Sequence, residues 1–120
     1  MYSNEVLDHF RHPRNVGEVA GAASVVEVSN PVCGDVMKLS ARVSGGKVAE
    51  VGFRVEGCVP AVACGSWLTE RMRGRPVAEL RAITAAEIES GLGGLPLASR
   101  HASALAVAAL ERWLELAGRE

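Results

Sequence analysis

The sequence predicts an α+β protein in which a small three-stranded antiparallel sheet packs against a layer of helices. Two observations support this fold class. Segments of alternating apolar and polar residues lie on either side of Gly45-Gly46, which is typical of a β-hairpin. The longest apolar stripes at helical spacing come after this hairpin, and strands followed by helices favour an antiparallel sheet under helices over alternating βαβ units.

The composition predicts one domain over residues 1–120. The chain is 48% hydrophobic and has a formal net charge of -1, with acids and bases mixed along it. It is long enough to bury a core, and its charge gives no reason to expect nucleic acid or a membrane surface as a partner. The N-terminus lacks signal-peptide features, and no apolar run reaches the ~20 residues that span a bilayer. We therefore expect a cytoplasmic protein whose three cysteines are ligands, nucleophiles or buried thiols rather than disulfides.

The start of the chain predicts one short helix and one strand. Ser3 is expected to cap a helix over residues 3–10. The apolar positions that share one face of this helix are Val6, Leu7 and Phe10. His12 to Gly17 is expected to form a loop, because Pro13 disfavours the helical conformation in the residue before it. A β-branched run then predicts a strand over residues 22–29.

The hairpin is predicted from two strands over residues 37–44 and 47–55. Gly45-Gly46 joins them, because a Gly-Gly pair supplies the positive φ angles of a tight turn. The side chains expected to face the core are Met37, Leu39, Ala41, Val43, Val51, Phe53 and Val55. The antiparallel pairing brings the residues before the first strand and after the second strand to the same end of the sheet.

The second half of the chain predicts helices. The expected helical segments are 59–73, 76–81, 84–90 and 99–117, with an open loop over 91–96. The buried stripe of the first comprises Ala61, Cys64, Leu68 and Met72, and that of the last comprises Ala102, Leu105, Ala109, Leu110, Trp113 and Leu116. Gly74 ends the first helix, and Thr84 caps the third with Glu87 in the capping-box position. Cys64 is therefore expected to be a buried hydrophobic residue.

Four side chains with metal-binding chemistry flank these elements. Cys33 and Asp35 lie just ahead of the first hairpin strand. Cys58 follows the second strand, and His101 lies near the start of the last helix. Two thiolates, an imidazole and a carboxylate suffice for a zinc site, and a two-iron cluster takes the same number of protein ligands. Asp35 would be the exchangeable ligand or a nearby base, because its hard oxygen suits a soft cluster poorly.

Each of these donors has an alternative role. Cys33 and Cys58 could be small core residues. Asp35 could accept a hydrogen bond in a turn or cap, and His101 could be a surface histidine or a histidine satisfied by neighbours.

Several separated motifs occur in an order that resembles one known family. They are Tyr2-Ser3, Val6, Asp8-His9, Pro13-Arg14-Asn15-Val16-Gly17, Cys33-Gly34-Asp35-Val36-Met37-Lys38-Leu39, Gly57-Cys58, and Leu95-Pro96 followed by His101. Over nearly its whole length the chain resembles the IscU/NifU-type iron-sulfur cluster assembly scaffolds. The resemblance implies an α+β fold and a site where a cluster is built from iron and from sulfur that a cysteine desulfurase delivers. The family site positions matched in this sequence are Cys33, Asp35, Cys58 and His101.

The sequence departs from the family pattern at two places. The family has a third cysteine, which resembles the sulfur acceptor, directly after the histidine, and this chain has Ala102. Alanine can neither bind iron nor carry a persulfide. The family's chaperone-recognition stretch Leu-Pro-Pro-Val-Lys is replaced by Leu95-Pro96-Leu97-Ala98-Ser99, which places recruitment by a DnaK-type chaperone in doubt.

Three functions remain open at the level of sequence. The favoured one is a scaffold-like carrier without turnover of its own, which binds zinc, iron or a transient [2Fe-2S] cluster and transfers it to acceptor apo-proteins. The second is a zinc-dependent sulfurtransferase accessory of a cysteine desulfurase, in which a ligand thiol accepts sulfane sulfur. The third is a degenerate homologue kept for partner binding.

Overall fold

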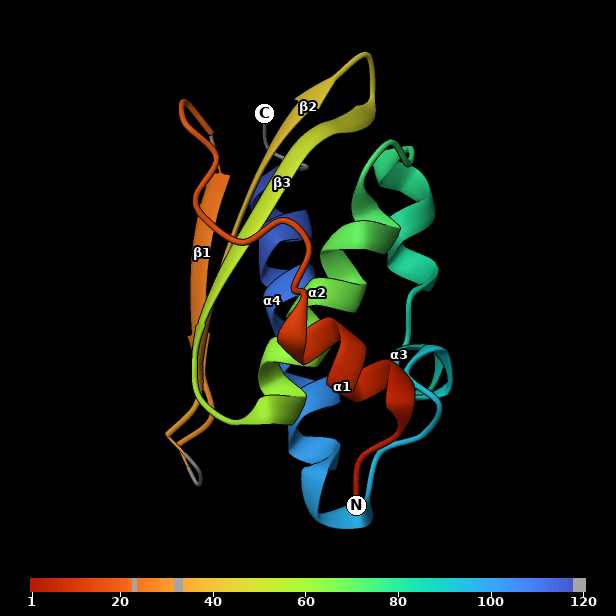
Figure 1. Cartoon of the computed structure of the whole chain (residues 1–120). Helices are drawn as coiled ribbons and strands as arrows, with labels where there is room; N and C mark the ends of the chain where they lie inside the picture. The colour runs from red at the N-terminus through yellow and green to blue at the C-terminus, as the bar shows by residue number, and fades with distance from the viewer. Residues whose placement is uncertain (23, 32–33, 118–120) are drawn as a thin grey trace.

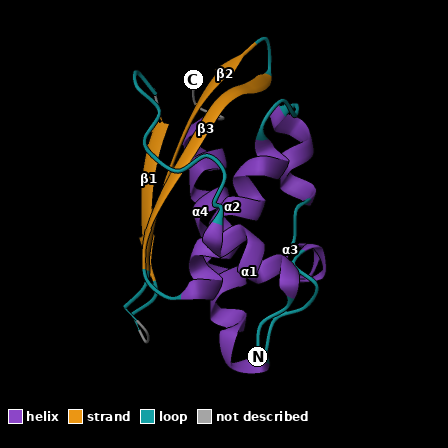
Figure 2. Ribbon diagram, viewed as in Figure 1, coloured by secondary structure: helices purple, strands orange, loops and turns teal. Residues whose placement is uncertain are grey.

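The computed structural model describes residues 1–22, 24–31 and 34–117 (Figures 1 and 2). The helices are α1 (Asn4–Arg11), α2 (Val59–Met72), α3 (Ala85–Gly91) and α4 (Arg100–Ala117), with short 3-10 helices η1 (Val77–Ala82) and η2 (Leu97–Ser99). The strands are β1 (Ser24–Ser29), β2 (Val36–Ser44) and β3 (Lys47–Glu56). The prediction of an α+β fold with a three-stranded antiparallel sheet is confirmed.

The sheet has the strand order β1-β2-β3, and helices cover one of its faces (Figure 1). Helix α2 packs on β3, and α4 packs on β1 and β2. Helix α1 lies against α2, and α3 lies against α4. Among the described residues, none of the helices is both long and apolar enough to cross a membrane.

The core lies between the sheet and the two long helices. The predicted stripe of α2 is confirmed, because Ala61, Cys64, Leu68 and Met72 are all fully buried. The ring of Phe53 on β3 packs so closely on α2 that a Cβ added to Gly65 would lie 2.5 Å from it. Real Cβ atoms do not approach a ring this closely, so glycine is the residue that allows α2 to lie flat on the sheet.

The predicted helix starts and stops are largely confirmed. The Ser3 hydroxyl accepts a hydrogen bond from the Val6 N–H at 3.0 Å, and the Thr84 hydroxyl accepts one from the Glu87 N–H at 3.1 Å. Gly74 follows the C-cap of α2 with a φ of 80°. The segment expected to be helical over 76–81 is a 3-10 helix displaced by one residue.

Two predicted core positions are wrong. Val43 is 36% exposed next to the hairpin turn, although it lies opposite the buried Val48; the register shift between Arg42 and Val43 leaves Ala49 as the extra residue of β3. Phe10 is 40% exposed, and His9 takes its place on the buried face of α1. Two further predicted core residues, Val55 and Leu116, are half-buried and pack against the core.

The outer face of the hairpin is less exposed than its polar residues predict. The Ser40 hydroxyl is buried and accepts a hydrogen bond from the Val19 N–H at 3.0 Å. A Cβ added to Gly52 would lie 2.4 Å from the Gly17 carbonyl oxygen, so the chain after α1 passes directly over β3. This segment crosses the sheet in Figure 1 and connects α1 to β1.

Candidate metal centre

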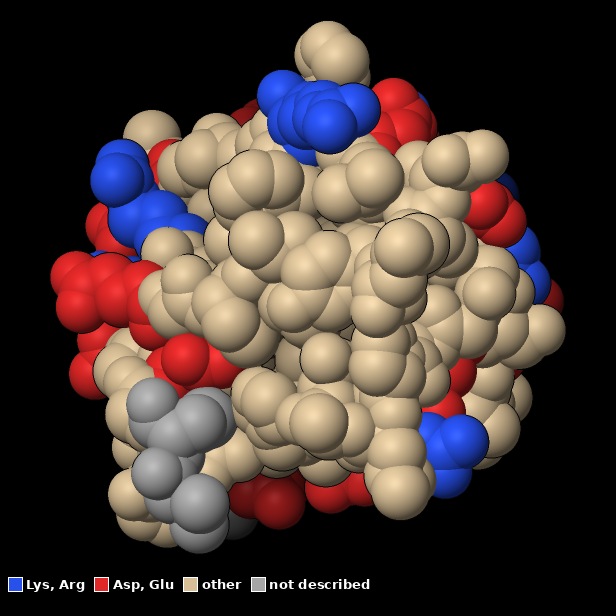
Figure 3. All heavy atoms as spheres, turned by 60° about the horizontal axis from the view of Figure 1, so that its bottom comes forward, with Lys and Arg blue, Asp and Glu red and all other residues tan. Residues whose placement is uncertain are grey.

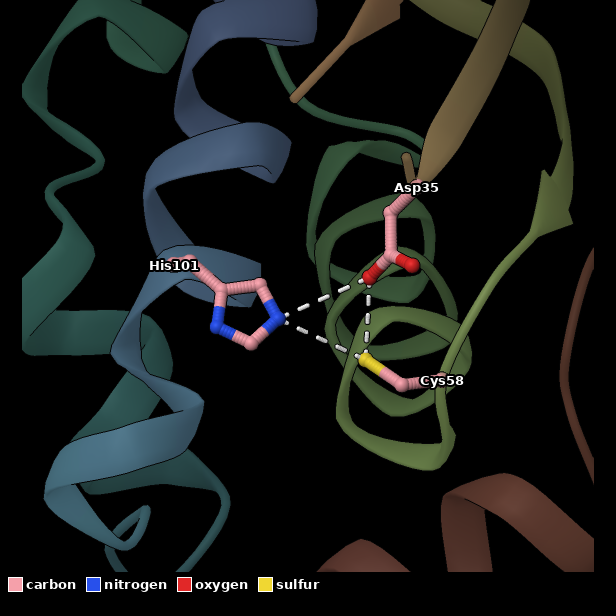
Figure 4. A group of neighbouring side chains, drawn as sticks. All are labelled: Asp35, Cys58 and His101. Atoms are coloured by element: carbon pink, nitrogen blue, oxygen red, sulfur yellow. Dashed lines mark hydrogen bonds and ion pairs between the residues drawn. The ribbon is translucent and has the colours of Figure 1, made fainter. Parts of the chain in front are cut away.

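Three of the predicted donors converge at the end of the sheet where β2 begins and β3 ends. Asp35 immediately precedes β2, Cys58 is the N-cap residue of α2, and His101 lies in the first turn of α4. Their potential ligand atoms all lie within 4.8 Å of one another, and Figure 4 shows the three side chains pointing toward a common point. The predicted antiparallel pairing of the two hairpin strands is confirmed, and it brings Asp35 beside Cys58. The predicted position of Cys33 beside Cys58 falls outside the described residues.

The carboxylate of Asp35 is held inside this end of the sheet. Asp35 is only 5% exposed, and its carbonyl oxygen accepts a hydrogen bond from the Asn30 N–H at 2.8 Å, which closes the loop before β2. A Cβ added to Gly57 would lie 2.6 Å from both Cγ and Oδ1 of Asp35. Gly57 therefore makes room for the carboxylate beside Cys58, and its φ is not in the left-handed region that would otherwise explain a glycine.

Cys58 contacts both other donors. Its thiol donates a hydrogen bond to Asp35 Oδ2 at 3.0 Å, and its Sγ lies 3.6 Å from His101 Nε2. Burial, followed by the hydrogen bond to Asp35, raises the pKa of the Cys58 thiol to about 11, although the Ala61 N–H at the start of α2 acts in the opposite direction. The free thiol is therefore protonated at neutral pH and gives up its proton when a cation replaces it.

The ring of His101 is oriented by a backbone carbonyl. Its Nδ1 lies 3.1 Å from the Ala98 carbonyl oxygen, which can only accept a hydrogen bond, so Nδ1 carries the proton in the neutral ring. The lone pair of Nε2 then faces Cys58 Sγ and Asp35 Oδ2, each 3.6 Å away. A histidine held in this tautomer is prepared to bind a metal through Nε2.

The centre lies near the surface, at an end of the molecule where uncharged side chains predominate (Figure 3). The His101 side chain is 30% exposed. A shallow hollow beside it is lined by Ser29, Asn30, Pro31, Ala104, Leu105 and Ala108. Figure 3 brings this end forward and shows mostly uncharged atoms, with Lys, Arg, Asp and Glu side chains toward the margins. A metal bound here would be accessible from outside the protein.

The remaining cysteine predictions have different outcomes. Cys33 lies outside the described residues. Cys64 is fully buried on α2, and burial raises the pKa of its thiol to about 12, which agrees with the prediction of a buried hydrophobic residue. Ala102 is also fully buried, in the turn that carries His101.

Two groups that shape the site, the Ala98 carbonyl and Gly57, do not belong to any side-chain motif in the sequence. The Ala98 carbonyl is a backbone group, so no residue type signals its role. The role of Gly57 depends on a contact across two strands, although a glycine directly before a candidate ligand is a usable hint. Together these groups place one sulfur, one nitrogen and one oxygen donor in reach of one cation, a set compatible with zinc or iron.

The fold and the three donors define a small α+β protein with a mixed thiol, imidazole and carboxylate centre at one end of its sheet. Residues 1–115 match the family described as the NifU-like N terminal domain. The chain belongs to this family.

Named relatives agree with this assignment. The iron-sulfur cluster assembly scaffold protein IscU 1 of Archaeoglobus fulgidus is 42% identical over 112 residues, which cover 93% of this chain and 73% of the relative. The iron-sulfur cluster assembly scaffold protein IscU of Aquifex aeolicus is 38% identical over 111 residues, which cover 91% of this chain and 71% of the relative. The sequence-based resemblance to IscU/NifU-type proteins is therefore confirmed.

A solved structure supports the fold. The N-terminal part of a NifU-like protein from Brucella abortus superposes with a TM-score of 0.65, covering 95% of this chain and 79% of that chain. The sequence identity of the pair is 19%, so this likeness concerns the fold alone.

Replacing Gly57 with alanine is expected to displace Asp35 from Cys58. The new Cβ would overlap the carboxylate, so the hydrogen bond that helps raise the pKa of Cys58 would weaken. The pKa should fall below 11 but stay above its ordinary value, because burial is the larger cause of the shift. Each unit of decrease multiplies the thiolate fraction at fixed pH about tenfold. The measurement is the pH dependence of Cys58 alkylation, resolved by mass spectrometry.

Asp35→Asn is the comparison for this experiment, because it removes the charge while nearly keeping the size of the side chain. The change that Asp35→Asn causes in the pH dependence of Cys58 alkylation shows how large the effect of Gly57→Ala can be. A Gly57→Ala profile identical to that of the parent, alongside a shifted Asp35→Asn profile, would contradict the positioning role of Gly57.

Cys64 is expected to be the least reactive described thiol. Its pKa is about 12 against about 11 for Cys58, which alone gives a roughly tenfold lower thiolate fraction, and full burial blocks access further. Iodoacetamide at pH 8 should modify Cys58 more than about ten times faster than Cys64 in the native protein. The two rates should converge in denaturant. Comparable native rates would show that α2 opens readily.

Proposed function

We propose that this protein is an iron-sulfur cluster assembly scaffold that holds iron, or a nascent [2Fe-2S] cluster, at Asp35, Cys58 and His101 and transfers it to acceptor proteins. The observation that carries the proposal is the convergence of these donors within 4.8 Å from three separate elements. Membership of the NifU-like family and the names of the relatives support the same function.

Binding depends on the exchange of a proton for a metal ion. The Cys58 thiol donates its proton in a hydrogen bond to Asp35 Oδ2. A cation at the point where the three donors meet would bind the Cys58 thiolate, and Asp35 would accept the departing proton and pass it to solvent. His101 contributes its Nε2 lone pair without losing a proton, because Nδ1 already holds it. Affinity should therefore rise with pH as the competition from the thiol proton decreases.

The proposed ligand set is poor in sulfur. Cys33 would supply a second thiolate, as the sequence predicts, and Ala102 supplies none. A cluster held partly by carboxylate and imidazole is bound less firmly than one held by four thiolates, which suits a protein that must release it. A cysteine desulfurase would provide the sulfur. The altered segment from Leu95 to Ser99 gives no support for recruitment of a DnaK-type chaperone.

A zinc-binding function is the second candidate, and the mixed donor set favours it. One sulfur, one nitrogen and one oxygen donor match the ligands that zinc takes in proteins, and Cys33 would complete a four-ligand set. In that case Cys58, released from the metal, would accept sulfane sulfur from the desulfurase. Turnover of sulfur in the presence of zinc, without iron, distinguishes this candidate from the scaffold.

Anaerobic reconstitution with Fe²⁺, sulfide and a cysteine desulfurase tests the proposal. The parent should bind about one metal ion or one cluster per chain, read by metal analysis and visible absorbance. Cys58→Ser and His101→Ala should each weaken binding by at least about 100-fold, beyond the roughly 10–100-fold typical of residues outside the ligand set. Cys64→Ala is the matched control, because its thiol is buried on the same helix, and it should retain full occupancy.

Full metal occupancy in Cys58→Ser would show that the centre has been placed wrongly. Loss of occupancy in Cys64→Ala, with the fold intact by circular dichroism, would show that the control thiol belongs to the ligand set.

A thiol at position 102 is expected to improve cluster binding. Residue 102 follows His101 in the same turn of α4, about 100° further round the helix. Because thiolate binds cluster iron better than carboxylate or water, Ala102→Cys should increase the yield and lifetime of the reconstituted cluster. The new thiol should also collect the most persulfide when desulfurase and cysteine are supplied. Chelator challenge and mass spectrometry of sulfur adducts provide the two measurements.

Ala78→Cys is the control for this gain of function, because Ala78 is exposed on η1, which lies beside Leu110 and Leu114 near the other end of α4. If the reconstituted cluster has the same lifetime in the parent and in Ala102→Cys, and the new thiol carries no sulfur adduct, then the alanine at position 102 does not limit cluster binding. A gain of the same size in Ala78→Cys would show that any added thiol suffices.

A further inference from the structure

The turn of α4 that carries His101 is tied to α3 by the carboxylate of Glu89. Glu89 Oε2 lies 2.7 Å from Ser103 Oγ, and Glu89 Oε1 lies 3.4 Å from Arg100 Nε. Arg100 and Ser103 enclose His101 and Ala102 in the sequence. One carboxylate therefore contacts the residues on both sides of the histidine.

The contact with Ser103 is short and protected from water. Ser103 is 1% exposed, and the Glu89 side chain is 21% exposed. The Ser103 hydroxyl also lies 2.9 Å from the Arg100 carbonyl oxygen. A hydroxyl has one proton, and the charged carboxylate is both the nearer and the stronger acceptor, so Ser103 donates to Glu89. Charge-assisted hydrogen bonds of this kind are stronger than exposed ion pairs.

Glu89 also supplies a charge that α4 lacks. The N-terminal turn of a helix carries a partial positive charge, which a nearby carboxylate stabilises. The Arg100 N–H already donates to the Leu97 carbonyl oxygen of η2, so the Glu89 carboxylate acts on the charge of this turn and not on a free N–H group. The first turn of α4 contains no acidic residue and begins with Arg100. In addition, the Glu89 carbonyl oxygen accepts a hydrogen bond from the Gly94 N–H at 2.7 Å, so the same residue holds the start of the segment that leads to α4.

We propose that Glu89 is the positioning residue for His101. By anchoring Arg100 and Ser103, it sets the first turn of α4, and with it the direction in which His101 Nε2 faces Cys58 and Asp35. This inference rests on the proposed function, because it assigns Glu89 a role in metal binding at that centre. Metal sites require their donors to be held to within about 0.5 Å. The Ala98 carbonyl oxygen also orients the ring, but Ala98 belongs to the same stretch of chain as His101 and would move together with the first turn of α4.

The first test is titration with Co²⁺, whose visible spectrum reports both affinity and ligand geometry. Glu89→Ala should weaken Co²⁺ binding about 10–100-fold, the range for residues that orient a ligand. Glu89→Gln should weaken it less, because it keeps an acceptor for Ser103 and loses the charge beside Arg100. Ser103→Ala should have an intermediate effect, and combining it with Glu89→Ala should add little, because both changes remove the same contact.

Glu87→Gln is the matched control. Glu87 lies on α3 as well, and its Oε1 lies 3.1 Å from Arg71 Nη2 on α2, away from the turn that carries His101. This variant loses an exposed ion pair from the same helix and should bind Co²⁺ like the parent.

The second test does not depend on metal. Nitrogen-15 spectra of the histidine rings in the metal-free protein report which His101 nitrogen carries the proton. Loosening the turn should reduce the population with the proton on Nδ1 in Glu89→Ala and Glu89→Gln, and Glu87→Gln should match the parent. If Glu89→Ala does not fold, Glu89→Gln and Ser103→Ala carry both tests.

Unchanged ring spectra and Co²⁺ affinity in the Glu89 and Ser103 variants would overturn the inference. So would an equal loss of affinity in Glu87→Gln, because the effect would then reflect general destabilisation of α3. If His101→Ala leaves Co²⁺ binding intact, the proposed ligand set fails instead, and the ring spectra still decide whether Glu89 positions His101.

Discussion

The antiparallel pairing of β2 with β3 is the constraint on which the candidate centre depends. Val36, the first residue of β2, lies opposite Glu56, the last residue of β3. Asp35 therefore lies just before β2 and Gly57 just after β3 at the same end of the sheet, and Cys58 comes next. A slip of one residue would turn the buried face of a strand outward. The same side chains that form the core therefore fix the register that brings the carboxylate to the thiol.

The polar groups of the centre satisfy one another. A buried carboxylate without a partner costs several kcal/mol. Asp35 instead accepts a hydrogen bond from the Cys58 thiol and faces the His101 ring. The Ala98 carbonyl oxygen accepts a hydrogen bond from the other ring nitrogen, Nδ1. This arrangement keeps the thiol protonated until a cation competes for it.

The sequence predicted most of the fold because its local signals agree with the packing. The Gly45-Gly46 turn, the α2 stripe and the caps at Ser3 and Thr84 all depend on residues close in sequence. The differences from the predicted pattern have non-local causes. The register shift between β2 and β3 brings Val48 into the core, and the polar face of the hairpin is covered by a segment that crosses it from α1.

For the site, the sequence by itself determined which donor types are present and, through the hairpin, that Asp35 and Cys58 share one end of the sheet. Only the tertiary structure decided that His101 joins them, because the packing of α4 on β1 and β2 brings it from 43 residues further along the chain. It also decided the His101 tautomer and the place of Glu89. Both depend on contacts between groups distant in sequence or on the backbone, and residue order alone does not encode their geometry.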